Sequence, residues 1–386
     1  MDAIILAGGF ATRLRPLTLT IPKPLLPILR KPLLEWIYED LLSENVSRII
    51  LSLHNMADKI IEHYRKKFPN APIKPLLEDK PLGDGGSLLN TLEKLGESID
   101  YPVIVLYGDI FARISYRDLY NFHVKNGGLA TVVGVYVNDV SRYGLLQVSE
   151  HNILKKIIEK PKDYPEKKGL VNAGIYVFSR EILDLVKNLR SEKLKREKIS
   201  IARDIIPILI DKGDVYVYRY NGVWSDIGTP IDYFRANIEA LRNVLKTTLH
   251  IDQSAKVDPE ARVEGPAYIG ENVEIRRDSY IGENVIIMSN VEIGEGVYIE
   301  NSLIMSGTSI KDHSFIKGSI IGESNIIGRW VRIYEGSILG SSIYIHDGVC
   351  IPSKTLILPH KEILDDHCEK KFSKTISQEP ESNIII

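Results

Sequence analysis

The stretch GGFATRLRPLTLTIPKP, residues 8–24, combines paired glycines, cations and hydroxyl groups and contains no acidic residue. Gly8 and Gly9 allow a backbone to approach phosphate oxygens closely, with peptide N–H groups as donors. Arg13 and Lys23 carry charges that neutralise a polyphosphate, the arginine through a planar fork and the lysine as a point charge. The spacing is neither GxxxxGK[ST] nor GxGxxG. A polyphosphate-binding loop is therefore one interpretation, and a surface turn with solvated cations is the other.

Two aspartates follow strand-like segments and are suited to a metal ion. Asp109 follows the apolar run VIVLY (103–107), and Asp226 lies in the turn sequence GVWSDIGTP (222–230). Carboxylate oxygens are the ligands that Mg²⁺ prefers, and the ion usually shares them with substrate phosphate. Each aspartate alone also fits a turn, and the sequence does not show that the two meet.

Three further stretches carry polar groups that a substrate could use. Glu78 precedes the glycine-rich sequence PLGDGGS, which ordinary turn chemistry also explains. Glu159 and Lys160 end an apolar run, and Asn172 begins the strand-like sequence NAGIYVF. The lysine could hold a second phosphate, and the glutamate and the asparagine could bind hydroxyl groups. For each residue taken alone, an ordinary polar surface is the alternative.

In the first half of the chain, these residues follow short segments rich in β-branched and aromatic side chains, which alternate with amphipathic segments. In KPLLEWIYEDLLSEN (31–45), for example, leucine and isoleucine recur at helical spacing. The alternation predicts an α/β fold with a Rossmann-like, mostly parallel sheet and helices on both faces. Ligands of such sheets bind beyond the carboxyl ends of the strands. The predicted strands are 3–7, 48–53, 103–107, 130–137, 172–178 and 215–220.

From about residue 250, aliphatic residues recur every six positions, over 251–299 and again over 321–357. This hexapeptide repeat predicts a left-handed parallel β-helix, in which each aliphatic side chain points into the core of a triangular coil. Between the two series, Ile304, Ile310 and Ile316 keep roughly the same period with shortened steps. We expect small bulges or loops there.

The two patterns divide the chain into four parts. They are an N-terminal domain that carries the candidate residues (1–232), a linker helix (233–250), the β-helix (251–364) and a polar C-terminal tail (365–386). The charge-dense run 187–198 is interpreted as a solvated helix or loop.

Composition excludes several classes of protein. Because 49 Lys and Arg face 51 Asp and Glu, the formal net charge is −2, and the chain has no global basic field for nucleic acid. No apolar run reaches the length of a membrane-spanning helix and no signal peptide is recognised, so we expect a cytoplasmic protein without a membrane partner. Cys350 and Cys368 form neither a metal-binding spacing nor a disulfide framework, and we expect reduced thiols.

Taken together, the motifs resemble those of the sugar-1-phosphate nucleotidylyltransferases, also called nucleotide-sugar pyrophosphorylases. LAGGFATRLRPLTLTIPKP is similar to the signature of that family, and PLGDGGS, YGD, EKP, VNAGIYVFS and WSDIGTP follow in the family's order. The resemblance covers nearly the whole chain. In the second half, SIIGESNIIGRWVRI (319–333) and ILPHKEI (357–363) look like the hexapeptide domain of mannose-1-phosphate guanylyltransferases.

This resemblance implies that an oxygen of a sugar 1-phosphate, here mannose 1-phosphate, attacks the α-phosphorus of a nucleoside triphosphate, here GTP, and that pyrophosphate leaves. It implies Mg²⁺ as the cofactor, held by Asp109 and Asp226. The implied catalytic residues are Arg13, Lys23, Asp109, Lys160 and Asp226. The implied nucleotide contacts are Leu6, Ala7, Gly8, Gly9, Thr12, Arg13, Lys23, Glu78, Gly83 and Asp109. The implied sugar-phosphate contacts are Gly144, Glu159, Lys160 and Asn172.

Glu78 bears on the choice of base. It lies five residues before Gly83, the spacing at which similar thymidylyl enzymes carry Gln and Gly against the base. A carboxylate only accepts hydrogen bonds, and guanine offers its N1–H and its amine side by side, whereas thymine offers one N–H between two carbonyls. Glu78 therefore favours guanine.

Two residues depart from the pattern of the family. Ala11 stands where glycine is usual, and because alanine avoids positive φ, either the backbone is ordinary there or the loop is altered. Asp84 stands where guanylyl enzymes usually carry threonine. Its carboxylate would either repel phosphate or hydrogen-bond to the ribose or the base.

Three other functions stay open on the sequence. One is a different substrate pair, such as glucose 1-phosphate with UTP or dTTP. Another is a second, acyltransferase activity of the β-helix, with His313 or His346 as general base. The third is a regulatory subunit that binds a nucleotide sugar without turnover, which the intact signature disfavours. Because regular coils stack well, we also expect a homo-oligomer.

Overall fold

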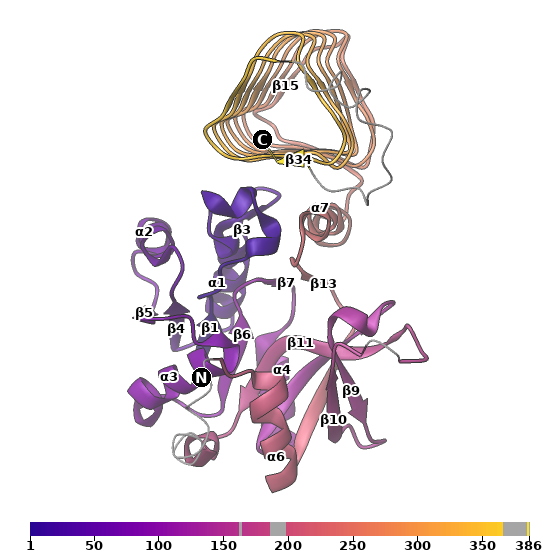
Figure 1. Cartoon of the computed structure of the whole chain (residues 1–386). Coiled ribbons are helices and arrows are strands. Elements are labelled where there is room, and N and C mark those ends of the chain that lie inside the picture. Colours follow the sequence, from indigo (N-terminus) through magenta and orange to yellow (C-terminus); the bar gives the residue numbers. More distant parts are fainter. Residues whose placement is uncertain (162–163, 186–197, 366–383, 386) are drawn as a thin grey trace. The chain divides into compact units, whose positions relative to one another are not determined.

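The computed structural model of the chain describes residues 1–161, 164–185, 198–365 and 384–385 (Figure 1). The chain forms two compact units. The α/β unit comprises Met1–Phe10 and Leu33–Asp226, and the β-helix unit comprises Ala11–Pro32 and Ile227–Ile386. Most of the predicted polar tail and of the charge-dense run lies outside the described residues.

The α/β unit is built on a nine-stranded mixed sheet, which confirms the predicted α/β fold. Strands β5, β4, β1 and β6 run parallel, and β12 runs parallel to β8, whereas β11 is antiparallel to β6, β8 and β9. In order along the sheet the strands are β10 (Leu154–Glu159), β9 (Gly144–Val148), β11 (Gly169–Phe178), β6 (Val103–Tyr107), β1 (Asp2–Leu6), β4 (Arg48–Leu53) and β5 (Ile73–Leu77); β8 (Ala130–Val137) pairs with β11, and β12 (Val215–Tyr220) pairs with β8.

Three of these strands, β5, β9 and β10, have no counterpart among the predicted strands. The sequence of β5, IKPLL, contains a proline, which sheets accept on an edge strand because its missing N–H faces no partner. Strand β5 is indeed the last in the sheet order. The antiparallel pair β9 and β10 adds the other edge.

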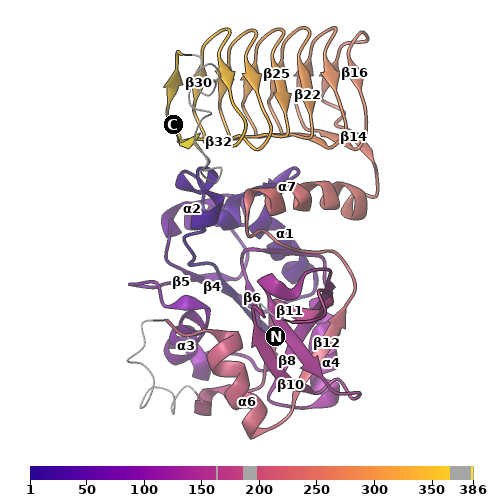
Figure 2. The ribbon, with the colours of Figure 1, turned by 45° about the vertical axis from the view of Figure 1, so that its right-hand side comes forward.

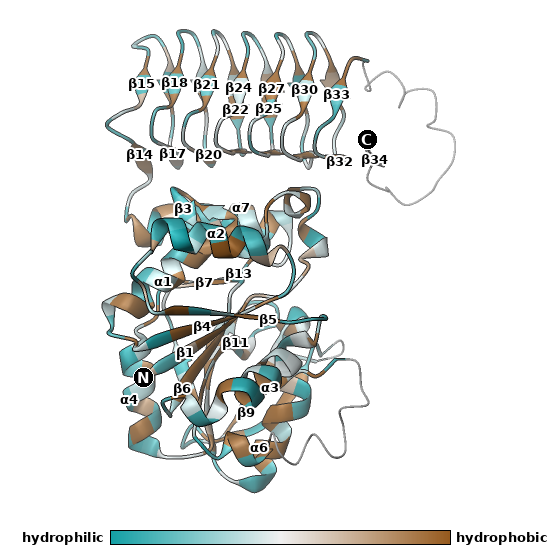
Figure 3. Ribbon diagram, turned by 90° about the vertical axis from the view of Figure 1, so that its left-hand side faces the viewer, coloured by the Kyte–Doolittle hydropathy of each residue, from teal (hydrophilic) through white to brown (hydrophobic). Residues whose placement is uncertain are grey.

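Helices cover both faces of the sheet, as the alternation predicted. Buried leucines of α3 pack with Ile4, Val103 and Val105 on one face. Residues that point the other way, such as Ala3 and Ile5, are equally buried. Figure 3 shows the central strands largely in the brown of hydrophobic residues. The helices are α1 (Leu33–Ser43), α2 (Ala57–Lys67), α3 (Gly83–Leu95), α4 (Tyr116–Asn126) and α6 (Ile206–Lys212), which continues a π-helix, Ile201–Ile205.

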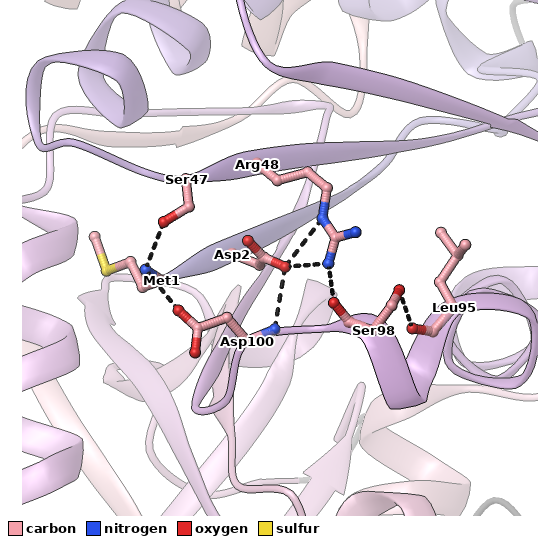
Figure 4. A network of polar contacts seen from close by, with 7 residues as sticks. All are labelled: Met1, Asp2, Ser47, Arg48, Leu95, Ser98 and Asp100. Atoms are coloured by element: carbon pink, nitrogen blue, oxygen red, sulfur yellow. Dashed lines mark hydrogen bonds and ion pairs between the residues drawn. The ribbon is translucent and has the colours of Figure 1, made fainter.

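A polar network ties the amino ends of the central strands together (Figure 4). Arg48, at the start of β4, donates through Nε to the Asp2 carboxylate at 3.1 Å, and the backbone N–H of Asp100 donates to the same oxygen at 3.1 Å. The terminal amine of Met1 lies 3.1 Å from the Asp100 carboxylate. Asp2 is only 2% exposed, so its charge is stabilised by these donors. The network fixes the edge of the sheet opposite to the carboxyl ends of the strands.

The second unit contains the predicted left-handed β-helix, whose triangular coils are seen end-on in Figure 1 and side-on in Figure 2. Its strands form three parallel sheets. The first sheet contains β14 (Leu249–Ile251), β17 (Ala267–Ile269), β20 (Val285–Ile287), β23 (Leu303–Ile304), β26 (Ile320–Ile321), β29 (Ile338–Leu339), β32 (Thr355–Ile357) and β34 (Ile384–Ile385). The second contains β15 (Lys256–Val257), β18 (Glu274–Ile275), β21 (Glu292–Ile293), β24 (Ser309–Ile310), β27 (Ile326–Ile327), β30 (Tyr344–Ile345) and β33 (Glu362–Ile363). The third contains β16 (Arg262–Val263), β19 (Tyr280–Ile281), β22 (Tyr298–Glu300), β25 (Phe315–Lys317), β28 (Arg332–Ile333) and β31 (Cys350–Ile351).

The coil register explains the break in the repeat. Ile281 pairs with Ile299, 18 residues on, whereas Ile299 pairs with Ile316 and Ile316 with Ile333, each 17 residues on. The expected bulge or loop is therefore absent from this described stretch, because a coil that is one residue shorter continues the same ladders. At the first coil, Ile251 is 42% exposed rather than buried.

Two more expectations concern the ends of the β-helix. Cys350, at the start of β31, is disulfide-bonded, so the expectation of a reduced thiol is wrong at this position. Cys368 lies outside the described residues. The predicted linker segment contains helix α7 (Pro230–Glu239), which continues as a π-helix, Ala240–Val244, and Leu249 already begins β14. In the described part of the chain, no helix has the length and apolar character needed to span a bilayer.

The glycine–cation stretch of the sequence is divided between the units, because Gly8 and Gly9 belong to the α/β unit and the rest to the β-helix unit. From Ala11 the chain forms short 3-10 turns at Thr12–Leu14, Leu17–Leu19 and Lys23–Leu25, then the hairpin of β2 (Pro27–Ile28) and β3 (Lys31–Pro32). The Tyr233 hydroxyl of α7 donates to the Pro27 carbonyl at 2.7 Å. The Thr20 and Ser341 hydroxyls are 3.1 Å apart, so the segment also contacts the β-helix.

Candidate active site

A pocket of about 380 Å³ lies at the carboxyl ends of β1 and β6 in the α/β unit. This is the edge of the sheet where an α/β fold binds its ligands, and the volume is in the range of small-molecule sites. Of the implied nucleotide contacts, six line it: Leu6, Gly8, Gly9, Glu78, Gly83 and Asp109. Ala7 is buried beside the pocket, and its N–H donates to the Ser52 carbonyl at 2.9 Å.

The paired glycines have different surroundings. A Cβ on Gly8 would stand 3.3 Å from Cβ of His54 and 3.4 Å from Oε2 of Glu78, so the missing side chain lets the backbone pass close to that carboxylate. A Cβ on Gly9 would meet nothing within 4 Å. Gly8 thus serves packing within the protein, and Gly9 offers its backbone to open space at the pocket.

Glu78 is a buried acid in the lining of this pocket. It is 7% exposed, and its Oε1 accepts a hydrogen bond from the Ser52 hydroxyl at 2.7 Å. Its backbone carbonyl lies 2.9 Å from Nδ1 of His54. Strand β4 supplies Ser52, and the end of β5 supplies Glu78, so a strand that the sequence did not predict positions the base-selecting candidate.

The glycines of PLGDGGS pack against another segment of the chain, 198–201. Gly83 has φ of 77°, and a Cβ there would stand 2.8 Å from the carbonyl oxygen of Ile199. The N–H groups of Gly85 and Gly86, in the first turn of α3, donate to the same oxygen at 3.0 and 3.3 Å. The start of α3 is therefore capped by protein, and Lys198 is brought to the wall of the pocket.

Asp84 has protein donors as partners, which neither of the two sequence alternatives anticipated. Its Oδ2 accepts a hydrogen bond from the Tyr107 hydroxyl and a second, at 3.2 Å, from the backbone N–H of Ile201. The carboxylate thus fastens the 198–201 segment to α3 and β6.

The two candidate metal ligands are brought together by a short ladder. Asp109 lies between β6 and β7 (Ile110–Ala112), and Asp226 ends β13 (Trp224–Asp226). The antiparallel register of β7 and β13 places Asp226 opposite Ile110, the residue that follows Asp109. The indole N–H of Trp224 donates to the Ala173 carbonyl at 3.0 Å, which ties this ladder to β11.

This pair of carboxylates fits a hard divalent cation. Among the described residues, no group of three or more His, Cys, Asp or Glu side chains is arranged to hold a metal ion. Mg²⁺ does not need such a cage, because it is commonly bound by one or two carboxylates and completes its octahedron with water and substrate phosphates. The donor set is therefore of the right kind for the predicted cofactor.

Three implied sugar contacts also converge. Gly144 and Glu159 are register partners of β9 and β10. A Cβ on Gly144 would stand 3.1 Å from Oε2 of Glu159 and 3.7 Å from Cβ of Asn172. Lys160 follows with φ of 46°, a left-handed conformation that is costly for a residue with a side chain and that concentrates at functional sites. Its ammonium lies 4.0 Å from the Glu159 carboxylate, and its side chain is 64% exposed.

The remaining implied contacts, Thr12, Arg13 and Lys23, belong to the β-helix unit. Thr12 and Arg13 are exposed on the first 3-10 turn, whereas Lys23 is 7% exposed. Ala11 has φ of 47° and ψ of 43°, so of the two sequence alternatives for this position, an ordinary backbone is wrong. The Thr18 hydroxyl donates to the Ala11 carbonyl at 2.9 Å and holds the turn in this shape.

The two histidines considered for acyl transfer contact the next coil of the β-helix. The His313 ring centroid lies 4.3 Å from that of Trp330. Nε2 of His346 lies 2.7 Å from the Glu362 carboxylate.

Sequence reasoning missed several residues that line the pocket or hold its acid, among them Ser52, Tyr107, Phe10 and Lys198. Ser52 and Tyr107 sit in strands whose hydrophobic pattern was recognised, but the pattern does not tell which polar side chain faces a ligand. Phe10 lies within the glycine–cation stretch, residues 8–24, and lines the pocket. Lys198 ends a run of charges, in which no feature separates it from its neighbours.

Comparison with known proteins identifies relatives over nearly the whole chain. Residues 2–243 match the nucleotidyl transferase family, and residues 263–373 match the GMPPB C-terminal domain. A mannose-1-phosphate guanyltransferase of Eremothecium gossypii is 34% identical over 367 residues, which are 94% of this chain and 97% of the relative. Mannose-1-phosphate guanyltransferase beta-A of Xenopus laevis is 33% identical over 380 residues, or 96% and 99% of the two chains. Among solved structures, that of HddC from Yersinia pseudotuberculosis complexed with GMP-PN matches 61% of this chain and 97% of HddC, with 32% identity and a TM-score of 0.50.

Proposed function

Because the chain belongs to the nucleotidyl transferase family, we propose that it transfers a guanylyl group from GTP to mannose 1-phosphate. The broader class, a sugar-1-phosphate nucleotidyltransferase, follows from the family and its full-length relatives. In the proposed reaction a phosphate oxygen of the sugar attacks the α-phosphorus of GTP. The bond between the α-phosphorus and the oxygen that bridges to the β-phosphate breaks, and GDP-mannose and pyrophosphate form.

The buried carboxylate of Glu78 in the pocket is the observation that carries the choice of base. Guanine presents an N1–H and an amine on one edge, and a carboxylate can accept both. The Ser52 hydroxyl fixes Oε1 from the protein side at 2.7 Å, which orients the carboxylate. A base with one N–H between two carbonyls would place an oxygen against a buried negative charge, which costs free energy. The binding of GMP-PN by HddC, a relative in structure, is in line with this assignment.

Asp109 and Asp226 are the proposed holders of Mg²⁺. When bound, Mg²⁺ would neutralise charge on the phosphate oxygens of the triphosphate. The two carboxylates would supply fixed negative charge at the carboxyl end of β6, on the ladder of β7 and β13. The hydrogen bond from Trp224 to β11 then keeps that ladder in place.

The cations and polar groups of the site have distinct proposed tasks. Arg13 stabilises the departing pyrophosphate, and Lys23 contacts the reacting phosphates. Lys160 holds the phosphate of the sugar. Its left-handed backbone, with the N–H bonded to the Tyr143 carbonyl at 2.9 Å, gives the side chain a fixed origin. Gly144, Glu159 and Asn172 bind the sugar hydroxyls.

We extend the proposal to assembly of several copies through the β-helix. Light scattering on the full chain tests this, since one copy has a mass of 43.6 kDa. A mass of one copy at micromolar concentration contradicts the assembly without touching the catalytic proposal.

A grid of triphosphates against sugar 1-phosphates, followed by pyrophosphate release, tests the substrates. We expect the highest kcat/KM for GTP with mannose 1-phosphate. Glu78→Gln should lower kcat/KM for GTP by about tenfold or more, since a neutral amide accepts less strongly and adds a donor. Glu35→Gln is a matched control, because Glu35 is also a buried acid with one partner, His63 at 2.9 Å. A wild-type preference for UTP or dTTP would show that the assignment from Glu78 is wrong.

A further inference from the structure

Four side chains of the α/β unit form a chain of hydrogen bonds that no proposed contact with substrate explains. Nδ2 of Asn172 donates to the Tyr176 hydroxyl at 2.7 Å. The Tyr176 and Tyr107 hydroxyls are 3.2 Å apart. The Tyr107 hydroxyl donates to the carboxylate of Asp84.

The order of donors along this chain is fixed. The single hydroxyl proton of Tyr107 points to Asp84, so the oxygen of Tyr107 is left to accept. The hydroxyl of Tyr176 must then donate to Tyr107, and its own oxygen accepts from the amide of Asn172. At the far end, Oδ1 of Asn172 accepts from the Gly174 N–H at 3.0 Å, so the amide has one orientation. The carboxylate of Asp84 thus sets the direction of every bond up to Asn172.

The two tyrosines pack against each other inside the unit, whereas Asp84 and Asn172 at the two ends are partly exposed. Tyr176 is fully buried, and the two tyrosine rings meet edge to face with centroids 5.9 Å apart. Burial raises the pKa of both hydroxyls above the ordinary tyrosine value, so both stay protonated donors. Gly174, with φ of 73°, leaves room for Tyr107, because a Cβ there would stand 2.5 Å from Cδ2 of the ring.

The two ends of the chain lie in different parts of the candidate site. Asp84 and Tyr107 line the pocket that holds Glu78. Asn172 lies beside Gly144 and Glu159, the implied sugar contacts. Asp84 also receives the N–H of Ile201 and thereby holds the segment that carries Lys198 to the pocket wall.

We propose that Asp84, Tyr107 and Tyr176 are positioning residues. Through their hydrogen bonds to Asn172, they couple the nucleotide pocket to the orientation of the Asn172 amide, which binds the sugar 1-phosphate. The proposal rests on the proposed roles of Asn172 and of the pocket. If nucleotide binding shifts α3 or the 198–201 segment, the change reaches Asn172 through directed hydrogen bonds. If either tyrosine hydroxyl is removed, the two ends become independent.

A double-mutant cycle between Asp84→Ala and Asn172→Ala tests the coupling. Each single variant should lower kcat/KM for the sugar 1-phosphate. The kcat/KM of the double variant should be about fivefold or more above the value expected from multiplying the two single losses. This factor is of the usual size for a coupling between linked sites. When the cycle is repeated in the Tyr107→Phe variant, the observed kcat/KM should lie within about twofold of the value expected from multiplying the two single losses. Asp84→Asn, which keeps an acceptor oxygen, should recover part of the loss.

Asp204→Ala is the matched control, because its carboxylate accepts the Ser200 N–H of the same segment at 2.9 Å and lies outside the hydrogen-bonded chain of Asp84. Its effect should multiply with that of Asn172→Ala. Calorimetric titration of sugar 1-phosphate with and without nucleotide gives the same cycle without turnover. Additive losses for Asp84 and Asn172 in both measurements overturn the proposal. Because the cycle uses whichever pair the wild type turns over or binds best, a preference other than GTP and mannose 1-phosphate contradicts the proposed function alone.

Discussion

The β-helix depends on aliphatic residues that recur along the sequence, whereas the candidate site of the α/β unit depends on single polar residues. In the β-helix, one requirement recurs from coil to coil, a buried aliphatic side chain on each short strand from β17 to β33. In the α/β unit, the residues that matter most stand singly at strand ends, and each depends on a strand far away in the sequence. A structural requirement that recurs at a fixed spacing can be recognised in a sequence, whereas the contacts of a site assembled from distant strands cannot. The two units should therefore respond in opposite ways to single substitutions.

The sharpest contrast is expected at Asp109. Asp109→Asn keeps the shape and removes the charge, so we expect kcat to fall about a thousandfold, roughly 4 kcal/mol of transition-state stabilisation. The free energy of unfolding should stay within about 1 kcal/mol of the wild type. Pyrophosphate release and urea unfolding measure the two effects. Asp118→Asn, an exposed acid in the first turn of α4, is the control. Near-normal turnover of Asp109→Asn contradicts the role in metal binding.

The opposite response is expected at Ile327, which is fully buried in the β-helix core. Ile327→Ala should cost about 3 kcal/mol of unfolding free energy, because it leaves a cavity in a stack of close-packed coils. Turnover per folded molecule should be unchanged. Ile326→Ala is an adjacent control, since Ile326 is 47% exposed on the same strand, β27, and should cost under about 1 kcal/mol. Equal losses for the two variants would mean that the coil register is wrong.

Much of the β-helix could be predicted because each coil repeats the last. The exceptions lie where repetition ends, at the exposed Ile251 of the first coil, and where it shortens, between Ile299 and Ile316. In the α/β unit, the strand pattern predicted the carboxyl edge of the sheet and Asp109 on it. It did not predict that Asp226 lies beside Asp109, because that follows from the antiparallel pairing of two three-residue strands.

The contacts of Asp84 show a second limit to what could be predicted from the sequence. The sequence places Asp84 in a glycine-rich motif, and a motif suggests ligand contact. Its real partners, Tyr107 and Ile201, come from a strand and from a segment more than a hundred residues later. Which of several buried polar groups pair with one another is decided by the packing of elements, and that information is not local in the chain.

A pH measurement tests whether the α/β unit also contains polar groups that serve stability alone. Burial lowers the pKa of His123 to about 4, and Glu181 opposes this shift. The ring nitrogens lie 2.9 Å from the Thr131 and Ser179 hydroxyls. The unfolded chain takes up a proton at this histidine as the pH falls through about 6.5, whereas the folded protein resists down to about pH 4. The contribution of neutral His123 to the free energy of unfolding is therefore complete above about pH 6.5, and it is lost progressively as the pH falls from about 6.5 to about 4.

We expect the wild type to lose about 2 kcal/mol more than His123→Gln when urea unfolding at pH 7.5 is compared with pH 4.5. His151→Gln, at an exposed histidine, should follow the wild type. Turnover at pH 7.5 should be the same for all three proteins. An identical pH dependence for wild type and His123→Gln would show that this imidazole is not held neutral.

The smallest expected effect is at Ala11, a residue of the β-helix unit with a left-handed backbone. The corners of the β-helix repeatedly use left-handed backbone, and several are occupied by residues that tolerate it, including Asn272, Asn290 and Gly296. Ala11 takes the same conformation without the polar side chain by which asparagine can hydrogen-bond locally, and this costs about 1–2 kcal/mol. Ala11→Gly removes that strain but gives the unfolded chain more freedom, which offsets about 0.4–1 kcal/mol.

The balance predicts that Ala11→Gly stabilises the protein by about 0.5 kcal/mol, measured by urea unfolding. Ala236→Gly, in the interior of α7, should destabilise by about 1 kcal/mol or more, because a helical backbone gains nothing from glycine. If Ala11→Gly is as destabilising as Ala236→Gly, the turn does not carry the strain that its φ implies. If it is stabilising but slows turnover, then the strained alanine keeps the following Thr12 and Arg13 in their active positions, and this turn is shaped for catalysis rather than for stability.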